Sequence, residues 1–219
     1  MFGFSPKKRS FSSFFPDGMD RHCHILPGVD DGVSTMDEAL ALIQRMKEAG
    51  FRGAYCTPHI MQRFPNSVQA LQQRFHELVS RAEGMEFELH LAAEYMIDEC
   101  FDAVIKSGEP LSWDGQHVLV EMPQYMLPCG WMDSISLLTE RGYTPVLAHP
   151  ERYVRLFEPE DFVDLSEQGI LFQGNIGSFY GYYGSQVRAL AQQLLKLDLY
   201  SCWGSDAHSE GMLQRVLGH

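Results

Sequence analysis

The sequence predicts an α/β protein in which parallel strands and helices alternate and close into a barrel. Seven short apolar runs alternate with helical patterns over nearly the whole chain, as in proteins whose parallel strands are joined by helices. Polar residues stand at or just beyond the carboxyl ends of these runs, which meet on one rim of a βα barrel. An open doubly wound sheet more often carries a glycine-rich phosphate loop, and neither GxGxxG nor GxxxxGK[ST] occurs here.

Each expected strand is a short apolar run, and the strands are residues 19–25, 53–57, 88–94, 117–122, 144–149, 170–175 and 199–205. Helices are expected at 36–49, 67–82, 98–106, 131–141, 159–168 and 185–197. Asp37 and Glu38 lie in the first turn of the first helix and Gly50 follows its end, as dipole and capping preferences favour. The aromatic segment 177–184 is expected to form a rim loop after the sixth strand.

Length and composition indicate one domain. The 219 residues can bury a substantial core, and we expect a lead-in segment at 1–18 followed by a single barrel domain at 19–219. The lead-in combines basic residues with aromatic residues that can dock on the barrel, namely Lys7, Lys8, Arg9, Phe11, Phe14 and Phe15. It lacks the features of a signal peptide, and no apolar run reaches the roughly 18 residues of a membrane span. We therefore expect a cytoplasmic protein.

Charge and cysteine content exclude several classes of protein. The formal net charge of -12 argues against a nucleic-acid partner, because phosphate backbones are bound chiefly by clustered Lys and Arg. Bound cations can offset part of this charge, so acidity does not exclude a phosphate ester. The five cysteines form no CxxC pair, which indicates reduced thiols in a cytosolic protein.

A pair of histidines in the first strand is the first candidate for metal binding. His22 and His24 lie two residues apart, so both side chains leave the same face of the strand. The turn-rich stretch 27–32 can return Asp31 to the same place, with Asp30 beside it. Taken alone, an HxH pair is more often an ordinary surface or core pair. Its combination with a DDG loop and isolated polar residues at later strand ends favours a metal site.

Later strands end in the same kinds of side chain. Glu94 and Glu121 close apolar runs, where a carboxylate is costly to bury unless it is paired or bound to a cation; a salt bridge remains the alternative for Glu121. The remaining candidate ligands follow the second, fifth and seventh strands, and are His59, His149, Asp206 and His208. His76, His90, His117 and His219 are read as ordinary histidines.

The candidate ligands offer imidazole nitrogen and carboxylate oxygen but no thiolate, which suits manganese, iron or zinc. Clustered divalent cations activate water and stabilise charge during hydrolysis of a phosphoester. Arg152 is placed to contact a phosphate oxygen, with a surface ion pair as the alternative. A cysteine phosphatase needs C-x5-R, and the nearest approach has six residues between Cys56 and Arg63. The sequence therefore indicates a metal-dependent phosphoester hydrolase.

The motifs resemble those of the PHP (polymerase and histidinol phosphatase) superfamily. Within it, they are most similar to the bacterial tyrosine phosphatases of capsule and exopolysaccharide systems, the CpsB/YwqE type. The resemblance runs from about residue 19 to 208 and rests on DRHCHILPGVDDG at 20–32, TPH at 57–59, AE at 93–94, AHPER at 148–152 and SDAH at 205–208. It implies a distorted seven-stranded barrel that holds three metal ions, most commonly Mn²⁺, with iron or zinc as alternatives.

Carried over residue by residue, the resemblance assigns the ligands to three ions. The first takes His22, His24, Glu94 and Asp206; the second takes Glu94, Glu121 and His149; the third takes Asp31, His59 and His208. Arg152 corresponds to a phosphate-contacting arginine, and a proton donor near Asp206 would serve the departing phenolate. The implied substrate is a phosphotyrosyl protein, a bacterial tyrosine kinase of polysaccharide export, and homo-oligomers occur in the family.

Two departures from the family pattern concern the end of the chain. The family usually has an arginine shortly after the final motif, whereas here Arg215 is the first basic residue after His208. The chain also ends at His219, without the usual longer helical tail. Tyr180 and Tyr182 are candidates to stack on a phosphotyrosine ring. The alternatives are a small-molecule phosphatase of the histidinol phosphatase kind, a phosphodiesterase, or a catalytically weak regulatory module.

Overall fold

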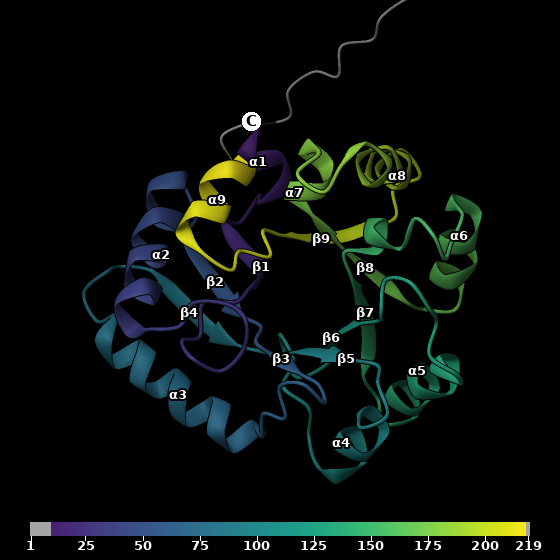
Figure 1. Cartoon of the computed structure of the whole chain (residues 1–219), viewed down its shortest axis with the longest axis horizontal. Helices are drawn as coiled ribbons and strands as arrows, with labels where there is room; N and C mark the ends of the chain where they lie inside the picture. The colour runs from purple at the N-terminus through teal and green to yellow at the C-terminus, as the bar shows by residue number, and fades with distance from the viewer. Residues whose placement is uncertain (1–9, 218–219) are drawn as a thin grey trace, which may run out of the picture.

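Strands and helices alternate along the chain in the computed structural model, which describes residues 10–217 (Figure 1). The strands are β1 (Met19–Cys23), β2 (Gly53–Cys56), β3 (His59–Ile60), β4 (Glu88–Leu91), β5 (Glu94–Met96), β6 (His117–Glu121), β7 (Thr144–Ala148), β8 (Leu171–Asn175) and β9 (Tyr200–Gly204). The helices are α1 (Phe11–Phe14), α2 (Met36–Ala49), α3 (Val68–Arg81), α4 (Phe101–Ser107), α5 (Trp131–Glu140), the 3-10 helix η1 (Pro150–Tyr153), α6 (Pro159–Glu167), α7 (Ile176–Tyr180), α8 (Ser185–Lys196) and α9 (Glu210–Leu217).

The strands form two parallel sheets that together make a distorted barrel. One sheet has the order β1-β2-β4 and the other β3-β5-β6-β7-β8-β9. The chain passes directly from β2 to β3 and from β4 to β5, so these pairs are two interrupted strands and the described ring has seven strand positions. A parallel bridge between Cys23 and Ala207 joins β1 to the segment after β9. Helices α2 to α6 and α8 surround the strands (Figure 1), which confirms the predicted α/β barrel.

The interruptions are the main difference from the predicted strands, because residues 88–94 were expected to form one strand. Pro58 follows β2 and has no N–H to donate to a neighbouring strand. The neighbouring chain breaks beside it, because β4 pairs with β2 whereas β5 pairs with β3. Between these pairs, the Ala92 N–H donates to the Cys56 carbonyl (2.9 Å) and the Glu94 N–H donates to the Pro58 carbonyl (3.1 Å). The break places His59 and Glu94 side by side at the start of the second sheet.

The first barrel helix shows how the sequence specifies the outer layer. Thr35 and Glu38 form a reciprocal capping box at the start of α2, an arrangement that stabilises a helix by about 1 kcal/mol. Leu42, Ile43 and Met46 lie on its inner face and are completely buried. Apolar residues spaced three and four positions apart form one face of this helix, and burial of that face packs the helix against the sheet.

The segment before β1 packs into the core through its aromatic rings. Phe14 is 2% exposed, and its ring centroid lies 4.6 Å from that of Trp203 and 5.1 Å from that of Phe179. Lys7, Lys8 and Arg9 of the expected lead-in lie outside the described residues, as does His219.

The aromatic segment after β8 begins as a helix, α7, where a loop was expected. The side-chain oxygen of Asn175 accepts a hydrogen bond from the Gly177 N–H (2.8 Å) and caps the helix. Phe179 faces the core. The helix therefore fixes the orientation of the tyrosines that follow Phe179, which are Tyr180, Tyr182 and Tyr183.

Candidate metal centre

The nine candidate ligands, far apart in sequence, meet on one rim of the barrel. Most of them are buried; the side chains of Asp31 and His208 are 45% and 26% exposed and lie at the mouth of the cluster. They come from β1 and the loop after it, from β3, β5 and β6, and from the segments after β7 and β9: His22, His24, Asp31, His59, Glu94, Glu121, His149, Asp206 and His208.

The deepest part of the cluster contains four side chains, which come from β1 and the residue after it, from β5, and from the segment after β9. The Nε2 atoms of His22 and His24 are 3.2 Å apart. The Glu94 Oε2 atom lies 3.2 Å from His22 Nε2 and 3.4 Å from His24 Nε2. The Asp206 Oδ1 atom lies 3.4 and 3.3 Å from the same two nitrogens. These four residues are those assigned to the first ion by resemblance.

Glu94 also belongs to a second group, because its other carboxylate oxygen faces His149. The Glu94 Oε1 and His149 Nε2 atoms are 3.0 Å apart, and Glu121 Oε2 lies 3.7 Å from the same nitrogen. His59 joins this group through Nδ1, which lies 3.1 Å from both Glu94 Oε2 and Glu121 Oε1.

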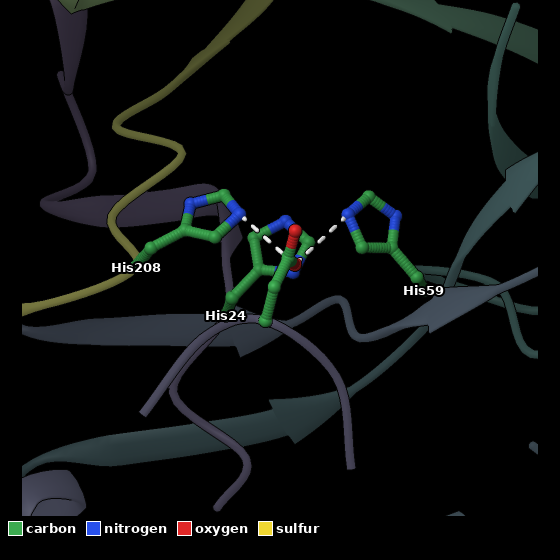
Figure 2. Close-up of side chains that lie close together, drawn as sticks. His24, His59 and His208 are labelled. Atoms are coloured by element: carbon green, nitrogen blue, oxygen red, sulfur yellow. Dashed lines mark ion pairs between the residues drawn. The ribbon is translucent and has the colours of Figure 1, made fainter. Parts of the chain in front are cut away.

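The third group lies at the mouth and centres on Asp31. Its Oδ1 atom is 3.4 Å from His59 Nε2 and 3.5 Å from His208 Nε2. Figure 2 shows His59 and His208 approaching from opposite sides, with His24 between them. One ligand atom from each of His24, Asp31, His59 and His208 lies within 4.8 Å of the others.

Buried charge shifts the pKa values of these groups. Burial alone would lower the pKa of His59, but Glu94, Asp31 and Glu121 raise it to about 10. Burial would raise the pKa of Glu94, whereas His22 and His59 hold it well below its ordinary value. Protons on imidazoles therefore balance the carboxylates in the absence of cations. Divalent cations bound by the same atoms would compete with those protons.

Polar atoms without hydrogen-bond partners indicate that the donor set fits metal ions. His59 Nδ1 and Glu121 Oε1 are both buried, and although they lie 3.1 Å apart, neither atom makes a hydrogen bond within residues 10–217. Such atoms are costly inside a protein unless they bind something. Nitrogen and oxygen donors without a thiolate are also the set expected for manganese, iron or zinc.

Three of the imidazoles are held so that Nε2 faces the cluster. His22 Nδ1 donates to the Gln173 side-chain oxygen (2.7 Å) and His24 Nδ1 to Asp30 (2.8 Å). His208 Nδ1 donates to the Asp206 carbonyl (2.9 Å). An acceptor behind each ring fixes its tautomer and leaves Nε2 as a lone-pair donor, the usual arrangement around metal-binding histidines.

Close backbone packing fixes the positions of His22, in β1, and of His24, directly after it. A Cβ atom on Gly204 would lie 2.4 Å from the His22 Cβ, and one on Gly32 would lie 2.2 Å from the His24 carbonyl oxygen. Asp20, which is buried below them, accepts hydrogen bonds from the Ser205 N–H (2.8 Å) and hydroxyl (2.5 Å). These contacts tie β1 to the end of β9, where the barrel closes.

Two of the candidate ligands have a left-handed backbone, as do Glu86 and Asp198 among the described non-glycine residues. His149 has φ = 36° and Asp206 has φ = 54°, values that non-glycine residues rarely adopt. His149 directly follows β7, and Asp206 lies two residues after the end of β9. Their left-handed backbones turn the side chains back over the rim, and strain of this kind is common at functional sites.

Arg152 lies at the edge of the centre and contacts one candidate ligand. Its Nη2 donates to Asp206 Oδ2, which also accepts from the Asn175 amide (3.1 Å). The Arg152 guanidinium carbon lies 4.0 Å from the centroid of the Tyr183 ring. The buried Tyr183 hydroxyl has no hydrogen-bond partner among the described residues. Tyr183 is thus a site residue that sequence reasoning missed, since nothing distinguishes it from its neighbours in the aromatic segment.

The other candidate substrate residues make aromatic and cation–π contacts. The Tyr180 ring packs against Phe14, with centroids 6.0 Å apart. Tyr182 lies beneath Arg215, whose guanidinium carbon is 5.7 Å from the ring centroid. No hydrogen bond or ion pair in the described part of the chain joins Arg215 to the nine candidate ligands. A substrate role for these three residues remains a prediction.

Comparison with known proteins decides the family. A family profile described as "Capsular polysaccharide synthesis, CpsB/CapC" matches residues 18–216. The chain belongs to this family. Among its relatives, the tyrosine-protein phosphatase YwqE of Bacillus subtilis is 30% identical over 196 residues, covering 87% of this chain and 77% of YwqE. The tyrosine-protein phosphatase CpsB of Streptococcus pneumoniae is 27% identical over 201 residues, covering 87% of this chain and 83% of CpsB.

Solved structures place the CpsB/CapC chain in the same fold. A structure from work on B. subtilis YwqE and S. pneumoniae CpsB, described as "unique metal-dependent tyrosine phosphatases", matches with a TM-score of 0.78 and 27% identity over 91% of this chain and 85% of that one. The phosphotriesterase homology protein of Escherichia coli matches with a TM-score of 0.52 at 10% identity, over 90% of this chain and 84% of that one, a likeness of fold alone. The resemblance inferred from the motifs is confirmed.

Proposed function

We propose that this chain is a metal-dependent protein-tyrosine phosphatase. The observation that carries the proposal is the set of imidazoles whose Nδ1 atoms are held by Gln173, Asp30 and a carbonyl, so that their Nε2 atoms face carboxylates at the barrel rim. Membership of the CpsB/CapC family supports the reaction, since relatives along most of the chain are tyrosine-protein phosphatases.

The proposed cofactor is three divalent cations, with Mn²⁺ as the first choice and iron or zinc as alternatives. His22, His24, Glu94 and Asp206 would hold the first; Glu94, Glu121 and His149 the second; Asp31, His59 and His208 the third. His59 Nδ1 also faces the second group, so its ring can serve either ion. Bound divalent cations supply Lewis acidity that activates water and neutralises phosphoryl charge.

The side chains around the cations have separate tasks in this proposal. The Arg152 guanidinium binds a phosphoryl oxygen and stabilises the charge that grows on it during in-line displacement. The Tyr183 ring lies against that guanidinium and limits its movement. Asp206 accepts from Arg152 and Asn175 through Oδ2 while Oδ1 faces the histidines, so it links the arginine to the metal centre.

The proposed substrate is a phosphotyrosyl protein, a bacterial tyrosine kinase that controls capsule or exopolysaccharide export, and the proposed location is the cytoplasm. None of the helices within residues 10–217 is both long and apolar enough to cross a membrane. Phenolate is a better leaving group than an alkoxide, so cleavage of an aryl phosphate requires less of a proton donor. All nine candidate ligands come from one chain, so the site does not need a homo-oligomer to be complete.

The test is phosphate release by metal-stripped protein resupplied with Mn²⁺. Phosphotyrosyl peptide, histidinol phosphate and a phosphodiester would be compared for wild type, His22→Ala and the control His76→Ala, whose side chain is exposed on α3. We expect Mn²⁺-dependent release chiefly from the peptide, lost in His22→Ala and kept in His76→Ala. Preferential release from histidinol phosphate or the diester would replace the tyrosine-phosphatase proposal, and silence on all three despite bound metal would indicate a regulatory module.

A further inference from the structure

A second feature of the rim is a cavity of about 500 Å³ that adjoins the metal centre at Arg152. Arg152 and Tyr183 line the cavity, and so do Tyr125 and Arg155, whose side chains are exposed. Arg152 contacts Asp206, so the cavity leads away from the place where a phosphoryl group would bind. A peptide carrying phosphotyrosine would extend along it.

The cavity is basic although the protein is acidic. Its lining residues include two arginines and no Asp or Glu, in a chain with a formal net charge of -12. Arg152 is paired with Asp206 on the inner side. Arg155 is exposed, and no ion pair joins it to a carboxylate within residues 10–217. The outer arginine therefore has a free charge directed at solvent.

The start of α8 adds further positive potential to the same cavity. Ser185 and Gln186, in the first turn of this 12-residue helix, line the cavity, and no side chain caps the helix. Uncapped N–H groups at a helix start favour anions. This contribution supplements the arginines and does not define the site alone.

Exposed apolar side chains extend the surface beyond the cavity. Tyr125 is 75% exposed and Met126 is 72% exposed, the largest values among the exposed large hydrophobic residues described. The Arg155 guanidinium carbon lies 5.4 Å from the centroid of the Tyr125 ring. Exposed aromatic and methionine side chains beside an arginine are typical of protein-binding surfaces.

We propose that this cavity binds an acidic residue of the substrate, close in sequence to the phosphotyrosine, through Arg155. The inference rests on the proposed phosphatase function and specifies its substrate class: phosphotyrosyl segments that carry Glu or Asp near the tyrosine. Arg155 supplies the charge, the start of α8 supplies N–H groups, and Tyr125 packs against the peptide chain.

The experiment compares phosphotyrosyl peptides that differ at one position. A neutral parent peptide receives a single Glu, Gln or Lys at each of the three positions before and after the phosphotyrosine, and kcat/KM is measured on Mn²⁺-loaded full-length protein at fixed ionic strength. At one or more positions, wild type should prefer Glu over Gln by about three- to fivefold, the size of an exposed ion pair supported by a helix terminus. Arg155→Gln should reduce this ratio to about one.

A charge reversal distinguishes a specific contact from a damaged protein. Arg155→Glu should prefer the Lys peptide over the Glu peptide at the same position, an inversion that misfolding does not produce. The control Arg81→Gln makes the same charge change on α3, on the far side of the ring (Figure 1), and should retain the wild-type ratio. Equal turnover of Glu and Gln peptides at every position, or a Glu preference that survives Arg155→Gln, would overturn the inference while leaving the phosphatase function in place. Absence of turnover on all peptides would remove both.

Discussion

The hydrogen bond between His22 and Gln173 offers a direct test of how the metal centre is organised. Both side chains are fully buried, and the two atoms are 2.7 Å apart. The Gln173 amide nitrogen donates to the Gly174 carbonyl (2.6 Å), which orients its oxygen toward the imidazole. Gln173→Leu keeps similar volume but removes the acceptor. His22 then has a buried N–H without a partner, and its ring can change tautomer or rotate.

The expected loss follows from two independent estimates. An unsatisfied buried donor costs about 1–3 kcal/mol, and loss of a residue that orients a metal ligand weakens metal binding by about 10- to 100-fold. A 100-fold change corresponds to about 2.7 kcal/mol, so the two ranges overlap. We therefore expect Mn²⁺ affinity of Gln173→Leu to fall by about 10- to 100-fold. Gln173→Glu has a side chain of the same length that still offers an oxygen acceptor to His22 Nδ1. This variant should therefore bind Mn²⁺ more tightly than Gln173→Leu.

Affinity would be measured by titrating metal-stripped protein against a chelator of known Mn²⁺ affinity, and activity at saturating Mn²⁺ on phosphotyrosyl peptide. Gln193→Leu, on the exposed face of α8, is the matched control and should behave as wild type. Wild-type Mn²⁺ affinity in a folded Gln173→Leu protein would refute the reasoning, because the contact would then have no role in orienting His22.

Three further predictions concern catalysis, pH and packing. Arg152→Gln should lower kcat/KM on phosphotyrosyl peptide by about 10²- to 10³-fold with unchanged metal content by elemental analysis; a loss of metal instead would assign Arg152 to the structure of the site. His59 has its pKa raised to about 10 in the metal-free protein, so its stabilising effect is complete below its unfolded pKa of about 6.5 and is lost as pH rises through 10. Metal-stripped protein should therefore melt at lower temperature at pH 9.5 than at pH 7, by about 2–4 °C for each kcal/mol lost, and an unchanged or higher melting temperature would contradict this. Phe14→Ala should cost about 3–5 kcal/mol of unfolding free energy in chemical denaturation, whereas Met126→Ala, at an exposed position, should cost little; equal stability of the two would contradict the packing of Phe14 in the core.

The barrel and its candidate ligands could be predicted because both depend on local, repeated features. An apolar run that ends in a carboxylate or imidazole is unusual, since the polar group is costly to bury without a partner. Glu94 and His149 both close such runs and both lie 1% exposed in the cluster. The convergence on one rim follows from parallel strand direction, which alternation with helices predicts.

The contacts that orient those ligands could not be predicted, because their residues look ordinary in sequence. Gln173 lies within a strand and Tyr183 is one of several neighbouring tyrosines. Their roles depend on contacts across the sheet or from a following loop, and single-sequence patterns do not specify such contacts. The strand breaks were missed for a similar reason: the effect of Pro58 on its neighbour appears only when Ala92 and Glu94 pair with the residues around it.

The position of the centre in the barrel gives the metal ions a structural role as well as a chemical one. His22 belongs to the three-stranded sheet and His24 directly follows its first strand, whereas Glu94 belongs to the six-stranded sheet and Asp206 follows its last strand. The two sheets meet at a bridge next to His22, with Asp206 donating its N–H to the His22 carbonyl (2.7 Å). A cation held by these four residues would cross-link the sheets where strand pairing is least extensive. Because a cation that binds only the folded state stabilises it by about 2.7 kcal/mol at 100 times its Kd, the site that performs the chemistry would also hold the barrel closed.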